Sequence, residues 1–207
     1  MTTASISPDL EAAMSQTATR PDSSDGSPPS EDSTIRAALA KGDARTAIAR
    51  CARVYGTAIG RFCMALLGSR SEAEEAVQET LLAAFDAAAT FRGEAPVRGW
   101  LFGIARRICA RRLEVRTRQA RRRVMMVEDG ASSGADEALD HARRGEVVRR
   151  ALADLRPTER EALLLRYEAE LSYREVAEAS GIDEAAARQR VSRALAKVRA
   201  EVERVGR

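Results

Sequence analysis

The chain has 207 residues, enough for one medium-sized domain or two small ones, and aromatic residues make up only 4% of it. Few aromatic residues and much alanine disfavour a strand-rich fold and favour small helical domains. The net charge of +3 identifies no partner, but basic and acidic segments are separated along the chain, which is typical of proteins that bind nucleic acid through one face.

The first segment, residues 1–33, is rich in Ser, Thr, Pro and Asp and holds six acidic residues and one basic residue. It has too few large apolar side chains to offset the entropy of ordering, so we predict a disordered tail. We interpret it as a solubilising tail; an autoinhibitory mimic of DNA is the alternative. It lacks a secretory signal, and no apolar run in the chain approaches a membrane span, which predicts a cytoplasmic protein.

Residues 34–116 show helical periodicity and are predicted to form a first helical domain. Within it, the stretch "SEAEEAVQETLLAAF" at 71–85 predicts an amphipathic helix with Val77, Thr80, Leu81 and Ala84 facing inward. The outward face is then acidic and carries Glu72, Glu75, Gln78 and Glu79. Phosphates would be repelled by such a face, whereas a basic protein partner would be attracted. An ordinary solvated helix face is the alternative.

The segment 98–123 carries ten arginines and one acidic residue, Glu114. This density predicts contact with a polyanion. Trp100, Leu101, Ile104 and Ile108 fit the buried stripe of the same helix, so we interpret Trp100 as a core residue. The arginines of 116–123 fit a solvated helix as well as they fit direct contact with DNA.

Residues 117–144 are predicted to form a flexible linker, because Gln, Arg, Ser, Gly and acidic residues dominate them. Residues 145–207 form a second predicted helical domain. The predicted fold is therefore all-α, with two small helical domains joined by this linker.

A helix-turn-helix is predicted in "LSYREVAEASGIDEAAARQRVSRALAKVRAEV". Ser172 begins the first helix, Gly181 allows the turn, and Asp183 begins the second helix. One face of the second helix is apolar, with Ala187, Val191, Ala194, Leu195 and Val198. The opposite face and its flanks suit base reading in the major groove, where Arg recognises guanine and Gln recognises adenine. Its candidate DNA contacts are Arg188, Gln189, Arg190, Ser192 and Arg193. A helical corner with a solvated basic face is the alternative.

Three matches to the Ser/Thr-x-x-Glu capping box predict where helices begin. They are Ser71–Glu74, Thr158–Glu161 and Ser172–Glu175, and each precedes an apolar-periodic run. These motifs mark structure and carry no chemistry.

Two stretches of the chain resemble extracytoplasmic-function sigma factors of bacterial RNA polymerase. "LLGSRSEAEEAVQETLLAAF" with "FRGEAPVRGWLFGIARRICARRL" is similar to their second region, and "LADLRPTEREALLLRYEAELSYREVAEASGIDEAAARQRVSRALAKVR" to their fourth region. The two matches cover about 45–116 and 145–200 in the family's order. The resemblance implies a factor that binds core RNA polymerase and directs promoter recognition, DNA melting and initiation.

The resemblance also implies roles for matched residues. Glu75, Gln78 and Glu79 would contact the clamp helices of the largest polymerase subunit, and the loop at about 91–97 would accept a flipped base. The residues expected along the minus-ten strand are Arg92, Arg98, Arg106, Arg107 and Arg112. The second helix of the helix-turn-helix would read the minus-thirty-five element. Arg107 and Arg111 stand where the family commonly has Asn and Asp, so no promoter sequence is transferred.

Two other function classes compete with this interpretation. A stand-alone helix-turn-helix regulator would explain the second domain but would not need the acidic face at 72–79. An enzyme has little support, because His141 and the three cysteines form no ligand or catalytic spacing. We therefore expect no metal, no cofactor and no small-molecule substrate. Members of the family are typically held inactive by an anti-sigma factor, which is the further partner that the resemblance implies.

Overall fold

The computed structural model describes residues 31–93, 95–124 and 141–205, and these residues form helices and connecting turns with no strand. The predicted all-α fold is confirmed. The helices are α2 (Glu31–Ala40), α3 (Ala44–Leu67), α4 (Arg70–Ala87), the short 3-10 helix η1 (Ala88–Thr90), α5 (Val97–Val124), α6 (His141–Ala153), α7 (Pro157–Tyr167), α8 (Tyr173–Ser180) and α9 (Glu184–Val205). Within the described ranges, no helix has the length and apolar character needed to cross a bilayer.

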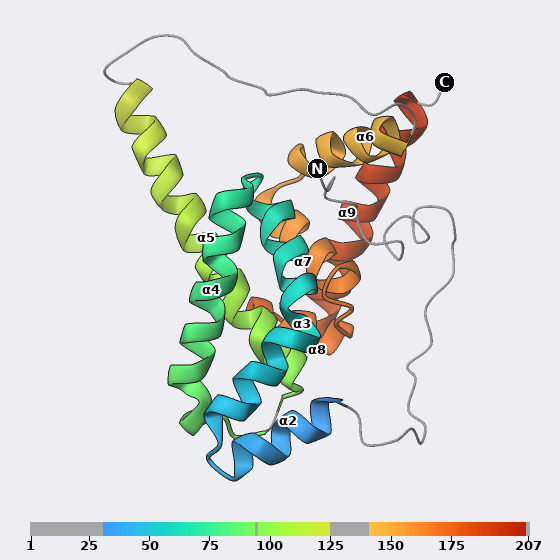
Figure 1. Ribbon diagram of the computed structural model, residues 1–207. Coiled ribbons are helices and arrows are strands. Elements are labelled where there is room, and N and C mark those ends of the chain that lie inside the picture. Colours follow the sequence, from blue (N-terminus) through green and yellow to red (C-terminus); the bar gives the residue numbers. More distant parts are fainter. Residues whose placement is uncertain (1–30, 94, 125–140, 206–207) are drawn as a thin grey trace.

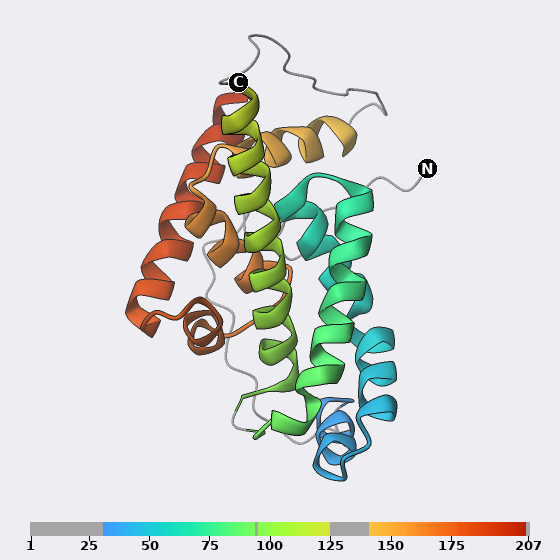
Figure 2. The same ribbon diagram turned by 90° about the vertical axis from the view of Figure 1, so that its left-hand side faces the viewer.

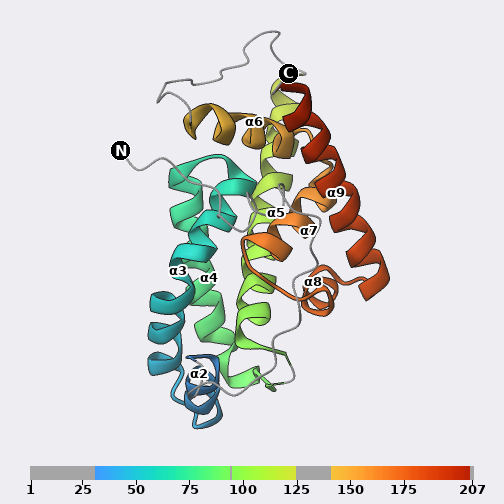
Figure 3. The ribbon, with the colours of Figure 1, turned by 90° about the vertical axis from the view of Figure 1, so that its right-hand side faces the viewer.

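The helix α5 connects the two halves of the molecule in space (Figure 1). One side of α5 packs against α3 and α4, and the other side packs against α8. Figures 2 and 3 show the same order from two directions, with the N-terminal helices on one flank of α5 and α7 to α9 on the other. A second contact joins α3 to α7. The last turns of α5 project beyond the other helices in Figure 1.

The core of the N-terminal half is centred on α3 and α5. Phe62 and Phe102 are fully buried, and their rings meet edge to face with centroids 5.5 Å apart. Of the predicted stripe on α5, Leu101, Ile104 and Ile108 are buried. Trp100 is half-buried and packs against the ring of Phe91, with centroids 4.9 Å apart. The predicted stripe is confirmed, with Trp100 at its edge.

Two of the three predicted helix starts are wrong by register. The helix α4 begins at Arg70, and its cap is Ser69, whose Oγ accepts from the backbone N–H of Glu72. Ser69, like Ser71, has a glutamate three positions later. Ser69 is the residue that caps the helix, so Ser71 lies in its first turn. The helix α7 begins at Pro157, which suits the first helical position because it has no N–H to satisfy, so Thr158 falls inside the helix.

The predicted linker is shorter than its composition indicates. Helix α5 continues past 116 to Val124, and α6 begins at His141, before the expected boundary at 145. Arginine and glutamine are good helix formers, so the polar residues after 116 can continue α5 although they provide no apolar face for packing. The rest of the predicted linker, and residues 1–30 of the predicted tail, lie outside the described residues.

Candidate functional site

The outward face of α4 is the first candidate surface. Thr80 and Ala84 are buried and Val77 and Leu81 are half-buried, so the helix turns the face that its sequence predicts toward the core. The acidic residues fall on the other side. Glu75, Gln78 and Glu79 are exposed, and Glu72 is half-buried.

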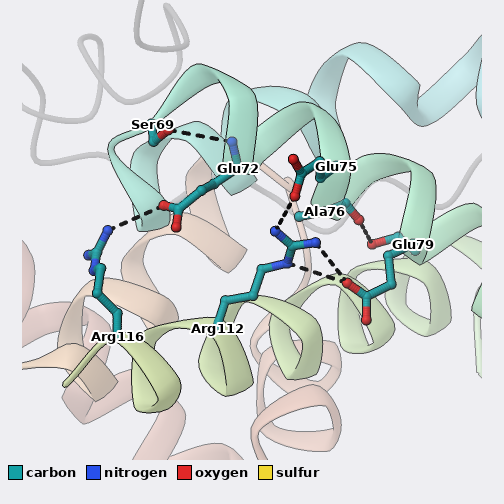
Figure 4. A network of polar contacts seen from close by, with 8 residues as sticks. Ser69, Glu72, Glu75, Ala76, Glu79, Arg112 and Arg116 are labelled. Carbon is teal, nitrogen blue, oxygen red and sulfur yellow. Dashed lines mark hydrogen bonds and ion pairs between the residues drawn. The ribbon is translucent and has the colours of Figure 1, made fainter. Parts of the chain in front are cut away.

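Two arginines of α5 hold the carboxylates of this face (Figure 4). Arg112 donates through Nη1 to Glu75 Oε2 at 3.0 Å and through Nη2 to Glu79 Oε2 at 3.1 Å. Arg116 donates to Glu72 Oε2 at 3.4 Å and to the carbonyl oxygen of Leu67 at 2.9 Å. The hydrogen bond that Arg112 donates to Glu75 raises the pKa of Arg112, as does the bond that it donates to Glu79, although desolvation opposes this rise. The α4 strip, defined as Glu75, Gln78 and Glu79, therefore has its two carboxylates fixed from one side.

Apolar side chains continue the α4 strip toward the end of the helix. Leu82 is 66% exposed and Phe85 is 47% exposed, the two largest hydrophobic side chains that α4 leaves in solvent. Sequence reasoning did not single them out. Their signal was their spacing, because Leu82 follows Gln78 and Glu79 by four and three positions and so shares their face.

The predicted minus-ten residues do not lie on one open surface. Arg92 and Arg107 are exposed. Arg98 instead donates through Nη1 to Glu170 Oε2 at 2.9 Å, and Arg106 donates through Nε to Glu161 Oε2 at 3.0 Å. Both acceptors come from the C-terminal half of the chain, 72 and 55 positions away. Arg112 points to α4, so three of the five predicted residues have carboxylate partners within the protein.

The C-terminal half contains the predicted helix-turn-helix in α8 and α9. Ser172 Oγ accepts from the N–H of Glu175 at 3.2 Å, and Glu175 Oε2 accepts from the N–H of Ser172 at 2.7 Å, which confirms this capping box. Gly181 has φ 66° and ψ 40°, the left-handed conformation that the turn requires. Asp183 Oδ1 then accepts from the N–H of Ala186 at 2.7 Å and so caps α9.

The second helix of this motif presents its predicted polar face to solvent. Gln189, Ser192 and Arg193 are exposed and Arg190 is half-buried, while the predicted inward residues Ala187, Val191, Ala194 and Val198 are buried. Arg188 is held by its neighbours, because it is paired with Glu184 at 2.6 Å and its guanidinium lies 4.4 Å from the ring centroid of Tyr173. Arg188 therefore differs from the other candidate contacts in being oriented before any ligand binds.

Possible metal ligands and the cysteine thiols are the remaining candidate groups among the described residues. They contain no group of three or more His, Cys, Asp or Glu side chains that could hold a metal ion. All three cysteines are buried, and none forms a disulfide bond. Burial raises the pKa of the Cys51 thiol to about 11, and the hydrogen bond to Cys63 together with burial raises the pKa of the Cys109 thiol. A raised pKa disfavours the thiolate, so Cys51 and Cys109 are poor candidates for nucleophiles.

Comparison with known proteins finds two matching family models. Residues 52–119 match the model described as Sigma-70 region 2, and residues 145–198 match the model described as Sigma-70, region 4. The "Probable RNA polymerase sigma-C factor" of Mycobacterium bovis is 33% identical over 137 residues, covering 63% of this chain and 70% of that protein. The "ECF RNA polymerase sigma factor SigG" of Mycobacterium tuberculosis is 34% identical over 157 residues, which cover 64% of this chain. The chain spans only 42% of the length of SigG.

Two solved structures are similar. RpoE of Bartonella quintana, solved in complex with the anti-sigma factor NepR, gives a TM-score of 0.58 at 26% identity and covers 72% of this chain and 92% of its own. CnrH, solved in complex with the cytosolic domain of CnrY, gives a TM-score of 0.61 at 24% identity and covers 84% of this chain and 97% of its own. The likeness to CnrH is one of fold.

Proposed function

Because the chain belongs to the ECF RNA polymerase sigma factors, we propose that it binds core RNA polymerase and directs promoter recognition, DNA melting and transcription initiation at a specific set of genes. The proposed division assigns α2 to α5 to polymerase and minus-ten binding and α6 to α9 to minus-thirty-five binding, with the chain between α5 and α6 as the linker and the residues before α2 as a tail. The chain would act in the cytoplasm without catalysis of its own.

The observation that carries this proposal is the α4 strip. Its carboxylates are exposed on the side away from Arg112, and the apolar side chains Leu82 and Phe85 follow them along the same helix. A solvated helix face has no need of two large exposed apolar side chains. Acidic and apolar groups in one row fit a basic, amphipathic partner helix, and the clamp helices of polymerase are the partner that the resemblance implies.

Arg112 belongs to this polymerase-binding surface rather than to the DNA strand. Its guanidinium reaches both Glu75 and Glu79, which stand one helical turn apart and would otherwise repel each other. Each of these exposed carboxylates accepts from Arg112 through its Oε2 atom, which leaves its Oε1 atom for a partner. We assign Arg112 the role of positioning the two carboxylates.

The promoter-binding surfaces are then two. The minus-thirty-five element would be read by Gln189, Ser192 and Arg193, which α9 exposes, with Arg188 and Arg190 at the flanks. The minus-ten strand would meet the exposed Arg92 and Arg107, joined by Arg98 and Arg106 once their internal partners release them. An anti-sigma factor is a proposed regulatory partner, as for RpoE with NepR.

The test is co-elution of the purified chain with core RNA polymerase on a sizing column. We expect the wild-type protein to co-elute with the polymerase. The Glu75→Lys/Gln78→Ala variant should lose binding, because it places a cation in the α4 strip. The matched control is Glu203→Lys/Gln189→Ala, which makes the same chemical changes on exposed positions of α9 and should still co-elute.

A stand-alone regulator is the second candidate, favoured by the complete helix-turn-helix. It predicts that wild type binds duplex DNA and fails to co-elute with polymerase. That result would leave the family relationship as one of fold and overturn the initiation role.

A further inference from the structure

Three arginines of the N-terminal half are paired with three carboxylates of the C-terminal half. Arg61 of α3 meets Glu168 at 3.1 Å, in addition to the pairs Arg98–Glu170 at 2.9 Å and Arg106–Glu161 at 3.0 Å. The acids lie on α7 and on the turn that follows it, and two of the arginines lie on α5. We call these three ion pairs the clasp.

Burial makes the clasp different from surface ion pairs. The side chain of Glu168 is 2% exposed and that of Glu161 is 10% exposed, so both carboxylates have given up water for arginine. A buried carboxylate is costly unless it is paired, and Arg61 and Arg106 of the N-terminal half supply an ion pair to Glu168 and Glu161. Arg106 adds a hydrogen bond to the carbonyl oxygen of Ala179 at 3.4 Å.

The clasp also carries signs of an arrangement that can be released. Glu170 is the one described non-glycine residue with positive φ, at 49°, a conformation that persists only where the surroundings hold it. The Nε of its partner Arg98 is buried without a hydrogen-bond acceptor among the described residues. An unsatisfied donor and a strained backbone both destabilise the arrangement in which the two halves are in contact. The three ion pairs stabilise the same arrangement.

The arginines of the clasp overlap those expected to hold promoter DNA. A carboxylate on a guanidinium occupies the place that a backbone phosphate would take, because both present paired oxygens to the same N–H fork. Arg98 and Arg106 are thus occupied in this arrangement, whereas the base-reading face of α9 at Gln189, Ser192 and Arg193 is exposed. The clasp occupies Arg98 and Arg106 of the proposed minus-ten surface and leaves the base-reading face of α9 open.

We propose that Glu161, Glu168 and Glu170 form an internal competitor for the minus-ten strand, so that the chain on its own is self-inhibited for single-stranded DNA until its two halves separate. The proposal rests on the DNA-binding part of the proposed function. It identifies the competing ligand as the phosphate backbone of single-stranded DNA. Opening exchanges three carboxylate–guanidinium pairs for phosphate contacts on at least Arg98 and Arg106.

The test compares two variants that remove the same charge. Glu161→Gln/Glu170→Gln weakens the clasp and leaves the buried Glu168 in place. Glu114→Gln/Glu178→Gln removes two exposed acids whose ion-pair partners among the described residues, Arg118 and Arg174, lie on their own helices. The probe is a fluorescent single-stranded DNA of mixed sequence, and its anisotropy gives the Kd at fixed salt.

We expect the clasp variant to bind this probe about tenfold more tightly than wild type, because apparent affinity rises with the fraction of open molecules. The control variant should change by much less. Equal gains in both would mean that net charge alone acts, and would overturn the proposal. No gain in the clasp variant would overturn it too.

A second measurement follows the halves directly. Dyes on Thr57→Cys and Ala200→Cys, two exposed positions of α3 and α9, report the distance between the halves by energy transfer. We expect the clasp substitutions and high salt to lengthen it, while the control substitutions do not. An unchanged distance in the clasp variant would contradict the proposal. Neither measurement uses polymerase, so failure of co-elution and failure of the clasp are separate results.

Discussion

The turn between α8 and α9 allows a quantitative prediction, because only backbone conformation is at stake there. Gly181 has φ 66°, and a Cβ built on it would meet no atom within 4 Å. Its N–H reaches the carbonyl oxygen of Glu178, and the N–H of Ile182 reaches that of Ala177 at 3.0 Å. Replacing Gly181 by alanine therefore adds no clash and breaks no hydrogen bond, and leaves only the left-handed conformation to oppose it.

We expect Gly181→Ala to lower the free energy of unfolding by about 1–2 kcal/mol, the usual cost of a left-handed non-glycine residue. Gly181→Asn should lose less, because asparagine tolerates this conformation. The matched control is Gly56→Ala in the interior of α3, where a Cβ also meets nothing within 4 Å. It should stabilise the protein by about 0.5–1 kcal/mol, because alanine is the better helix former.

Urea unfolding followed by helical circular dichroism measures all three variants. A loss of more than about 3 kcal/mol in Gly181→Ala would exceed the backbone cost and show that a side chain at this position disrupts packing. No loss at all would show that residue 181 does not need positive φ. Either result would refute the description of the turn that orients α9.

Three further predictions concern single contacts. Ser172→Ala removes the cap on the N–H of Glu175 and should destabilise the chain by about 1 kcal/mol in the same urea assay; an unchanged midpoint would mean that the cap contributes nothing. The hydrogen bond from Lys197 lowers the pKa of Glu159, although burial opposes this shift. The pair therefore stabilises the fold above the ordinary pKa of a carboxylate. This stabilisation is lost as the pH falls through the lowered pKa of Glu159 in the folded protein. The difference in Tm between wild type and Lys197→Met should accordingly shrink on acidification, and a constant difference would contradict this linkage. Both Arg112→Gln and Arg112→Lys should weaken binding to core polymerase roughly threefold. Lysine keeps the positive charge but lacks the planar guanidinium that reaches two carboxylates at once. Full affinity in the lysine variant would show that the charge alone suffices.

Local signals in the sequence were enough to predict the helix-turn-helix. A serine cap, a glycine at the turn and an aspartate cap each act within a few residues, so the roles of Ser172, Gly181 and Asp183 follow from the residues around them. The register of α4 was harder to predict for the same reason. Ser69 and Ser71 both precede a glutamate by three positions, and only the extended backbone of Ser69 decides which one caps the helix.

The partners of the arginines could not be predicted from the sequence. Arginine density marks a region that meets negative charge, but it does not say whether that charge belongs to DNA or to the chain itself. Arg98 and Arg106 find their acceptors 72 and 55 positions away, and those pairings follow from how α7 and α8 pack on α3 and α5. The family resemblance implied that Arg112 lies along the DNA strand, yet its position around α5 directs its side chain to Glu75 and Glu79 of α4.

The central claim is that the chain directs initiation, and run-off transcription tests it most directly. Core polymerase would transcribe fragmented genomic DNA of the bacterium that encodes the chain, with and without the purified protein, and sequencing would locate the 5′ ends. We predict a discrete set of start sites that require the protein and share two upstream elements. Start sites identical to those of core polymerase alone, from protein that is folded and in excess, would contradict the account.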